Sequence, residues 1–291
     1  MRAPTLPEPR RPPGRFLDTG AAPAAWNMAV DEVLLDACRA GLSGPRASEG
    51  LGAALRVYAW SPPALSLGRG QSAGRDVRLE VLEREGVGLC RRLTGGRAVL
   101  HDRELTYSLT GPEALLGRSI GETYRRVSEG LLVGLRRLGV PAELAPPAAP
   151  RAGGAYASHG SCFATASVWE LAAGGRKVVG SAQCRAGGAV LQHGSVLLRC
   201  QEERLAALLR PRGKGGVPVR PYAVGIEEIL GREVAFRELA AALREGLEGA
   251  LGMAFREAAL TPAERARAEA LAREEALARE RYGNPAWTLA R

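Results

Sequence analysis

Two residues that can carry covalent chemistry lie fifteen positions apart in the middle of the chain, Cys162 and Lys177. The chain has 40 Lys and Arg residues, and only two of them, Lys177 and Lys214, are lysine. Arginine keeps its proton, whereas a lysine ammonium can lose its proton when desolvated and can point at a single oxygen. An ammonium near a thiol lowers the thiol pKa and favours the nucleophilic thiolate. The pair predicts nucleophilic catalysis by Cys162 assisted by Lys177.

A single cysteine is more often a buried core residue than a nucleophile, so this alternative stays open. Two features favour chemistry for Cys162. It follows residues 145–160, which are rich in Pro, Ala and Gly and predict a mobile loop, where functional residues concentrate. It also precedes two predicted strands, 168–172 and 176–184, and a turn at Gly174-Gly175 would bring Lys177 towards it. The remaining cysteines are expected in or near the core: Cys38, Cys90, Cys184 and Cys200.

Glycine-rich turns and histidines supply further candidates. The segment Thr94-Gly95-Gly96-Arg97 is either a tight hairpin or a place where backbone approaches a flat or extended ligand. The segment Gly68-Arg69-Gly70-Gln71 allows the same two interpretations. His159 and His193 are the candidates for a Cys–His pair, which keeps a thiol hydrolase open, although each can be a packed histidine. The sequence contains no GxSxG, Walker A or HExxH motif.

Helices and strands alternate irregularly, which predicts an α/β (α+β) fold with a mixed β-sheet flanked by helices. The clearest helix runs over 119–138, where Ser119 and Glu122 form a capping box ahead of an apolar stripe. Further predicted helices are 24–39, 76–85, 201–210, 224–230, 236–251 and 262–281, and further predicted strands are 55–60, 64–68, 88–93, 97–101, 105–110, 189–198 and 253–257.

The predicted organisation has three parts. Residues 1–14 are basic and Pro-rich and predict a disordered arm. Residues 15–222 form the predicted catalytic domain. The composition changes near 212–222, and residues 223–291 are expected to form a small C-terminal helical lobe that completes the domain.

The composition argues against several classes of protein. The net charge is +9, but the arginines are mixed with glutamates along the chain and aromatic residues make up only 5%, which disfavours nucleic-acid binding. A basic surface instead suits acidic protein partners. Five widely spaced cysteines and three histidines predict neither a disulfide framework nor a metal site. The sequence has no apolar run long enough to span a membrane and no secretory signal, so a cytoplasmic protein is expected.

Three longer stretches, RRLTGGRAVLHDRELTYSL, SCFATASVWEL and GRKVVGSAQCRAGGAVLQHGS, resemble the LipM-type octanoyltransferases of the biotin/lipoate protein ligase and transferase superfamily. The closing RYGNPAWT is similar to the Tyr-x-x-x-x-Trp ending of lipoate ligases and these transferases. The resemblance covers residues 15–290 in order and implies the catalytic-domain fold of that superfamily.

The resemblance implies a specific reaction in endogenous lipoate biosynthesis. Family members move octanoyl from the thioester of acyl carrier protein to one lysine of a lipoyl-carrying protein, typically the glycine-cleavage H protein. A cysteine carries the acyl group between them, which would be Cys162, with Lys177 as the pocket lysine. No cofactor is implied, and a monomer is expected. The implied substrate-binding residues are Arg92, Thr94, Gly95, Gly96, Arg97, Ala98, His101, Gly180, Ser181, Ala182, Gln183, His193, Gly194 and Ser195.

Related activities remain as alternatives. The ATP-using lipoate ligases typically have three glycines followed later by Gly-Asn, whereas this chain has Thr94-Gly95-Gly96-Arg97 and then Arg103-Glu104-Leu105-Thr106, which favours a transferase. The sister amidotransferase, which moves octanoyl from H protein to other lipoyl domains, uses the same thiol chemistry. A lipoyl-protein or acyl-carrier binding module without turnover is the non-enzymatic alternative.

Overall fold

The computed structural model describes residues 13–43, 52–144, 170–211 and 222–282, with side chains up to residue 273. In chain order these residues form β1 (Pro13–Ala22), α1 (Ala24–Ser43), β2 (Ala54–Trp60), β3 (Ala64–Leu67), α2 (Ala73–Asp76), α3 (Leu79–Arg84), β4 (Gly88–Arg91), β5 (Val99–His101), β6 (Glu104–Pro112), α4 (Glu113–Leu116), α5 (Ile120–Arg137), β7 (Glu143–Leu144), β8 (Leu171–Ala173), β9 (Arg176–Ala186), β10 (Ala189–Leu197), α6 (Glu202–Leu208), α7 (Ile226–Leu230), α8 (Phe236–Leu251), β11 (Ala254–Glu257) and α9 (Pro262–Tyr282).

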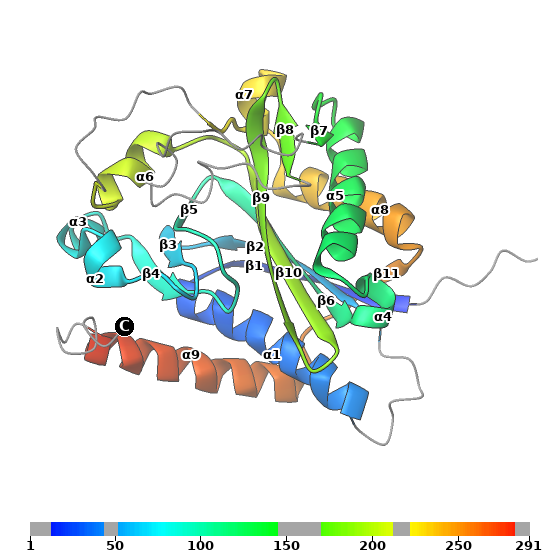
Figure 1. Ribbon diagram of the computed structural model, residues 1–291, viewed down its shortest axis with the longest axis horizontal. Helices are drawn as coiled ribbons and strands as arrows, with labels where there is room; N and C mark the ends of the chain where they lie inside the picture. Colours follow the sequence, from blue (N-terminus) through cyan, green and yellow to red (C-terminus); the bar gives the residue numbers. More distant parts are fainter. Residues whose placement is uncertain (1–12, 44–51, 145–169, 212–221, 283–291) are drawn as a thin grey trace, which may run out of the picture.

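A mixed eight-stranded sheet, in the order β11-β1-β2-β6-β10-β9-β8-β7, forms the centre of the molecule (Figure 1). Strand β1 runs parallel to both β11 and β2, and the pairings from β2 to β7 are antiparallel. A small sheet, β4-β3-β5, lies beside it. The predicted mixed sheet with flanking helices is therefore confirmed.

Helices α5 and α8 cover one face of the large sheet. Helix α5 begins where predicted, because the Ser119 hydroxyl accepts a hydrogen bond from the Glu122 backbone N–H at 3.1 Å. Its buried stripe, Val127, Leu131 and Leu135, packs into the main core with leucines of α8 and alternate residues of the strands. A Cβ at Gly246 would lie 2.1 Å from the Gly130 carbonyl oxygen, so the two helices approach at a distance that only glycine permits.

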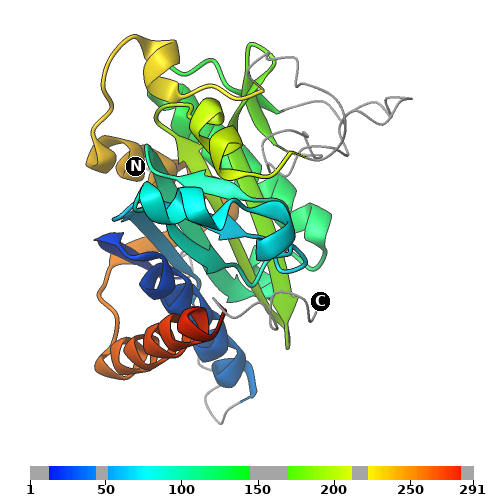
Figure 2. The ribbon, with the colours of Figure 1, turned by 90° about the vertical axis from the view of Figure 1, so that its left-hand side faces the viewer.

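Helix α1 covers the opposite face of the sheet, and α9 lies along the outer side of α1 (Figures 1 and 2). The apolar side of α1, with Val30, Val33 and Leu34, packs against Leu17 of β1 and Ala268 of α9. The small sheet and α6 lie over the part of this face that α1 leaves uncovered. Two separate groups of elements therefore cover this face, and a cavity can form between them.

The structure differs from the sequence-based elements in several places, and the short elements α4 and β7 are two that were not predicted. Strand β1 was not predicted, because its Pro13, Gly14 and Gly20 are typical of turns, but parallel partners on both sides supply its hydrogen bonds. Strands β4 and β5 do not form a hairpin, since both pair with β3. The predicted helix 76–85 is two short helices, α2 and α3, separated by the extended residue Val77.

The predicted C-terminal helical lobe contains α7, α8 and α9, and its one strand, β11, extends the large sheet beside β1. Pro13 and Gly14 of the predicted arm belong to β1. The remainder of the arm, the loop 145–160, Cys162, His159, the stretch 212–221 and the RYGNPAWT segment from residue 283 onwards lie outside the described residues. Over the described ranges, no helix combines the length and hydropathy needed to span a membrane.

Candidate functional site

The sheet face towards α1 carries buried polar side chains where apolar ones would be expected. Because side chains alternate along each strand, the register places two polar rows across four strands. Both rows are aligned from β2 to β9: Tyr58, Thr106, Ser195 and Gly180 in one, and Arg56, Ser108, His193 and Ala182 in the other. Buried polar groups of this density concentrate at functional sites.

A cavity of about 30 Å³ opens over these rows, here called the sheet cavity. Eight of the predicted substrate-binding residues line it: Arg92, His101, Gly180, Ser181, Ala182, His193, Gly194 and Ser195. Five further residues complete the lining: Met28, Tyr58, Trp60, Val99 and Thr106. Residues from α1, β2, the small sheet, β9 and β10, far apart in sequence, therefore meet at one place.

His193 is held by bonds to both ring nitrogens. Its Nδ1 lies 3.1 Å from Asp31 Oδ2 and its Nε2 lies 2.8 Å from Thr94 Oγ1. A carboxylate can only accept, so Nδ1 carries the proton and Nε2 accepts the Thr94 hydroxyl. Burial lowers the pKa of His193, and its bond to Asp31 opposes this only in part. The imidazole is therefore neutral, with a fixed tautomer.

Asp31 is the centre of a fully buried ionic network under the sheet cavity. Its carboxylate accepts hydrogen bonds from Arg56 Nη1 at 2.7 Å and from the Tyr58 hydroxyl at 3.0 Å. Arg56 also donates to Asn27 Oδ1 at 2.8 Å and to Thr19 Oγ1 at 2.9 Å. Burial alone would raise the pKa of Asp31, but the Arg56 charge and the His193 bond outweigh it and lower the pKa. Burial and the Asp31 charge raise the pKa of Tyr58.

A second chain of hydrogen bonds fixes His101. Arg92 Nη1 donates to Ser66 Oγ at 2.6 Å, and Ser66 lies 2.6 Å from His101 Nε2. His101 Nδ1 lies 2.6 Å from Glu104 Oε1, and the Trp60 ring stacks on the imidazole with 4.0 Å between centroids. The Arg92 guanidinium is thereby joined to the Glu104 carboxylate through Ser66 and His101.

The glycine turn 94–97 lies behind the sheet cavity. Thr94 reaches His193, while the carbonyl oxygens of Gly95 and Arg97 accept hydrogen bonds from Arg92 Nη2 at 3.1 and 2.9 Å. Gly96 lies against the other glycine loop, since a Cβ at Gly68 would be 2.0 Å from the Gly96 carbonyl oxygen. The close backbone contact here is thus between two loops of the protein.

Besides the turn 94–97, two of the predicted binding residues lie outside the lining of the sheet cavity. Ala98 is fully buried in the small-sheet core with Leu65 and Leu67. Gln183 donates to Gln192 Oε1 at 2.9 Å, on the strand face opposite Ala182. Neither lines the sheet cavity.

Lys177 is 5% exposed, and its Nζ donates to Glu170 Oε1 at 2.6 Å. The register between β8 and β9 shifts here, since Ala172 pairs with Lys177 and Leu171 pairs with Val179. Val178 and Val179 consequently both pack in the main core. This bulge turns Lys177 to the face of the sheet that also bears Gly180 and Ala182. The lysine therefore faces the side of the sheet cavity, at the end of β9 that follows Glu170.

Comparison with known proteins shows the family. A model described as the lipoyl protein ligase A/B catalytic domain matches residues 23–248. The chain belongs to the lipoyl protein ligase A/B catalytic domain family. Two of its curated relatives are octanoyltransferases LipM: that of Kyrpidia tusciae is 43% identical over 88% of this chain and 94% of the relative, and that of Symbiobacterium thermophilum is 39% identical over 94% and 97%.

Solved structures of the family share this fold. A lipoate-protein ligase A bound with ATP superimposes with a TM-score of 0.69 and 26% identity, over 90% of this chain and 93% of that one. A bi-partite lipoate protein ligase from Thermoplasma acidophilum has a TM-score of 0.66 and 24% identity over 90% and 91%, which supports the fold alone. The predicted resemblance, the fold and the assignment as a transferase enzyme are confirmed.

The sequence had signals for residues in and beneath the sheet cavity that were missed. Asn27 and Asp31 are polar residues one helical turn apart on the otherwise apolar inner face of α1, and Met28 lies beside them. Arg56, Tyr58 and Trp60 occupy alternate positions of β2, which puts all three on one face. In this family member the first helix and β2 thus supply the buried charges beneath the cavity.

Proposed function

We propose that this chain is a cytoplasmic octanoyltransferase of lipoate biosynthesis. It takes octanoyl from acyl carrier protein, carries it as a thioester on Cys162, and delivers it to a lysine of the glycine-cleavage H protein or another lipoyl domain. The single observation that carries this proposal is the identity of 43% over 94% of the length of a curated octanoyltransferase.

The lining of the sheet cavity suits an acyl substrate. Met28, Trp60 and Val99 give it apolar walls, and burying seven acyl carbons contributes about 5–6 kcal/mol at about 0.8 kcal/mol per CH₂. Its 30 Å³ is smaller than the roughly 150 Å³ of a cavity that binds benzene. Octanoyl binding therefore requires a side chain to move, and Met28, an unbranched and adaptable residue, is the one we expect to move.

Lys177 and the glycines of β9 suit the two steps of the reaction. In the first step, the Cys162 thiolate attacks the carrier thioester, a C–S bond to Cys162 forms and the C–S bond to the carrier breaks. The carrier leaves as a thiol that takes up the proton that Cys162 had lost. In the second, the acceptor amine attacks, the C–N bond forms, the bond to Cys162 breaks, and Lys177 passes the amine proton to the departing thiolate. Backbone N–H groups near Gly180 would stabilise the oxyanion in both steps.

Three of the four described cysteines have environments that favour a protonated thiol. Burial raises the pKa of Cys38, Cys184 and Cys200 to about 11 in each case. Thiols with such a pKa carry almost no thiolate at neutral pH and are poor nucleophiles. This supports Cys162 as the nucleophile. Cys162 is eight residues from Glu170, the partner of Lys177, and a segment of that length allows the thiol and the ammonium to meet.

Intact-protein mass spectrometry after mixing with octanoyl-acyl carrier protein tests the proposal. We expect one octanoyl adduct, mapped to Cys162, which is absent in Cys162→Ser and retained in the matched control Cys184→Ser. Addition of the unmodified H protein without ATP should move the group to a lysine of that protein. An adduct at another cysteine, or no adduct, would refute the proposed intermediate.

The same assay distinguishes the alternatives. Transfer that requires ATP and free lipoate or octanoate would identify a ligase. Loading from octanoyl-H protein but not from octanoyl-acyl carrier protein would identify an amidotransferase. Partner binding that survives Cys162→Ser without any turnover would identify a binding module.

A further inference from the structure

The backbone of Lys177 is held by residues 222–224, which belong to none of the described strands. The pairing of β9 with β10 ends at Val179, before it reaches Lys177. The Lys177 N–H instead donates to the Tyr222 carbonyl oxygen at 2.9 Å, and the Val224 N–H donates to the Lys177 carbonyl oxygen at 2.9 Å. Residues 222–224 therefore form a parallel bridge with Lys177 on the edge of β9 opposite β8.

These two hydrogen bonds set the direction of the Lys177 side chain. A side chain in a strand stands roughly perpendicular to the sheet, so its direction follows once the backbone N–H and C=O groups are fixed. Lys177 lies at the bulge in the pairing with β8, where the regular ladder is interrupted, and its Nζ reaches Glu170 Oε1 at 2.6 Å. The position of Nζ therefore depends on the position of residues 222–224.

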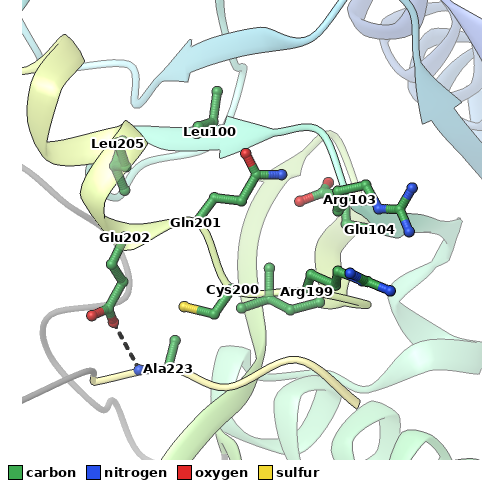
Figure 3. A pocket seen from close by; sticks show the side chains of 10 residues that line it. Leu100, Arg103, Glu104, Arg199, Cys200, Gln201, Glu202, Leu205 and Ala223 are labelled. Carbon is green, nitrogen blue, oxygen red and sulfur yellow. Dashed lines mark hydrogen bonds between the residues drawn. The ribbon is translucent and has the colours of Figure 1, made fainter. Parts of the chain in front are cut away.

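A carboxylate from α6 holds this segment on its other side. Ala223 is the middle residue of the parallel bridge, so its own N–H points away from Lys177. Glu202 Oε1 accepts this N–H at 2.8 Å, which Figure 3 shows as a dashed line. Burial raises the pKa of Glu202, and hydrogen bonds from the backbone N–H groups of Ala223 and Tyr222 oppose this rise. A cavity of about 30 Å³ opens beside Ala223, so side chains do not completely pack this side of the segment (Figure 3).

The two ends of the segment are fixed by different contacts. Gly225, directly after Val224, lies against the end of β10, since a Cβ there would be 2.2 Å from the Leu198 carbonyl oxygen. The Val224 end is therefore fixed without Glu202. The Tyr222 end, whose carbonyl oxygen accepts the Lys177 N–H, is the end that depends on the Glu202 carboxylate.

Glu202 also connects Lys177 with the small sheet. It is the first residue of α6, whose Leu205 and Leu208 pack in the core of the small sheet. His101 of that sheet lines the sheet cavity. The cavity lining and the Lys177 backbone are thus tied to the same helix.

We propose that Glu202 is a positioning residue for Lys177 and acts through the backbone of residues 222–224. This inference rests on the proposed function for the part that Lys177 plays in amide formation. After burial and the backbone hydrogen bonds, the charge of Arg176 also acts on the pKa of Glu202. The test must therefore separate the hydrogen bonds of the carboxylate from its charge.

Hydrogen exchange of the Lys177 backbone amide tests the coupling in the unacylated enzyme. The chain has only two lysines, so ¹⁵N-lysine labelling gives two backbone amide signals, and Lys177→Arg identifies the one from residue 177. Glu202→Met removes the acceptor oxygens and should speed exchange of this amide by about tenfold or more, as expected for a lost hydrogen bond to a carboxylate. Glu202→Gln keeps an acceptor oxygen without the charge and should recover most of the protection. Glu203→Met, at the exposed next position of α6, is the control and should exchange as the wild type does.

Single-turnover transfer from the octanoyl-loaded enzyme to the unmodified H protein tests the consequence for the reaction. We expect the maximal rate of amide formation to fall by about tenfold in Glu202→Met, because a misplaced catalytic group slows the chemical step. The H protein concentration that gives half of this rate should stay within about twofold of the wild-type value. Glu202→Gln should recover most of the lost rate, and Glu203→Met should transfer at the wild-type rate.

Several results would overturn the positioning role. One is unchanged exchange of the Lys177 amide in Glu202→Met, and another is faster exchange with an unchanged rate of amide formation. Equal effects of Glu202→Met and Glu202→Gln would assign the coupling to charge instead. In the wild type, a Lys177 amide that exchanges as fast as in an unstructured peptide would overturn the inference without requiring any variant to fold. Loss of octanoyl loading on Cys162 would refute the proposed function and leave the exchange result unaffected.

Discussion

Replacing Asp31 by asparagine tests whether the buried network positions the site. Asp31 is 1% exposed and its carboxylate contacts Arg56, Tyr58 and His193. The substitution keeps the shape of the side chain but removes the only anion in contact with the Arg56 guanidinium among the described residues. It also lets an amide N–H₂ face His193, which disfavours the tautomer with a proton on Nδ1.

The size of the effect follows from burial. Removing one partner of a buried ion pair costs about 3–5 kcal/mol, because the other charge remains buried without compensation. A change of 1 kcal/mol shifts the melting temperature of a protein of about this size by roughly 2–4 °C. We therefore expect Asp31→Asn to lower the melting temperature by about 6–20 °C. The double variant Asp31→Asn/Arg56→Met should lose at least about 1 kcal/mol less than the sum of the two single variants.

Asp36→Asn is the matched control for this experiment. Asp36 lies on the same helix and pairs with Arg39 at 3.0 Å, but both side chains are about half exposed, at 49% and 48%. An exposed pair of this kind contributes about 0–1 kcal/mol, so this variant should melt close to the wild type. Thermal and urea unfolding measure both. If Asp31→Asn melts within about 2 °C of the wild type, a buried charge network is not what supports the cavity.

Two further predictions concern the basic residues of the site. Because burial lowers the pKa of His193, the unfolded state binds more protons as the pH falls below about 6.5, and stability falls with it. His193→Gln should remove up to about 1.4 kcal/mol per pH unit of this acid dependence between pH 5 and 6.5 in urea unfolding; an unchanged slope would contradict a neutral His193. Lys177→Arg keeps the charge but cannot transfer a proton, so single-turnover amide formation should slow by about 10²–10⁴-fold, and wild-type turnover would remove Lys177 from the proton transfer.

Local patterns in the sequence were enough to predict most elements. The capping box at Ser119, the apolar stripe of α5 and the Gly174-Gly175 turn act within a few residues, and the structure has each of them. Strand β1 depends instead on partners more than 30 residues away in sequence, so its turn-like composition was misleading. The pairing of β4 and β5 with β3, rather than with each other, is likewise a non-local choice.

The candidate site was partly predictable because its motifs lie on strands. Gly180, Ala182, His193 and Ser195 share one face through a register that follows from the Gly187-Gly188 turn between β9 and β10. Two features of the site could not be predicted from the spacing of residues in the sequence. The bulge at Lys177 depends on pairing with β8, and the carboxylate under His193 comes from α1, a helix 162 residues earlier in the chain.

One arrangement recurs at the three basic groups on this face of the sheet. His193 is bound by Asp31 of α1, His101 by Glu104 of β6, and Lys177 by Glu170, which precedes β8. Each carboxylate comes from a different element, so the orientation of each basic group depends on the packing of the whole domain. Buried charges add little net stability in themselves, but removing one partner is costly, which ties each basic group to one geometry.

An acyl group with an apolar tail and a reactive carbonyl needs this combination of a deformable apolar end, at Met28, and fixed polar groups towards Lys177. The two ends of the site should therefore respond differently to substitution, the apolar end in chain-length preference and the polar end in rate.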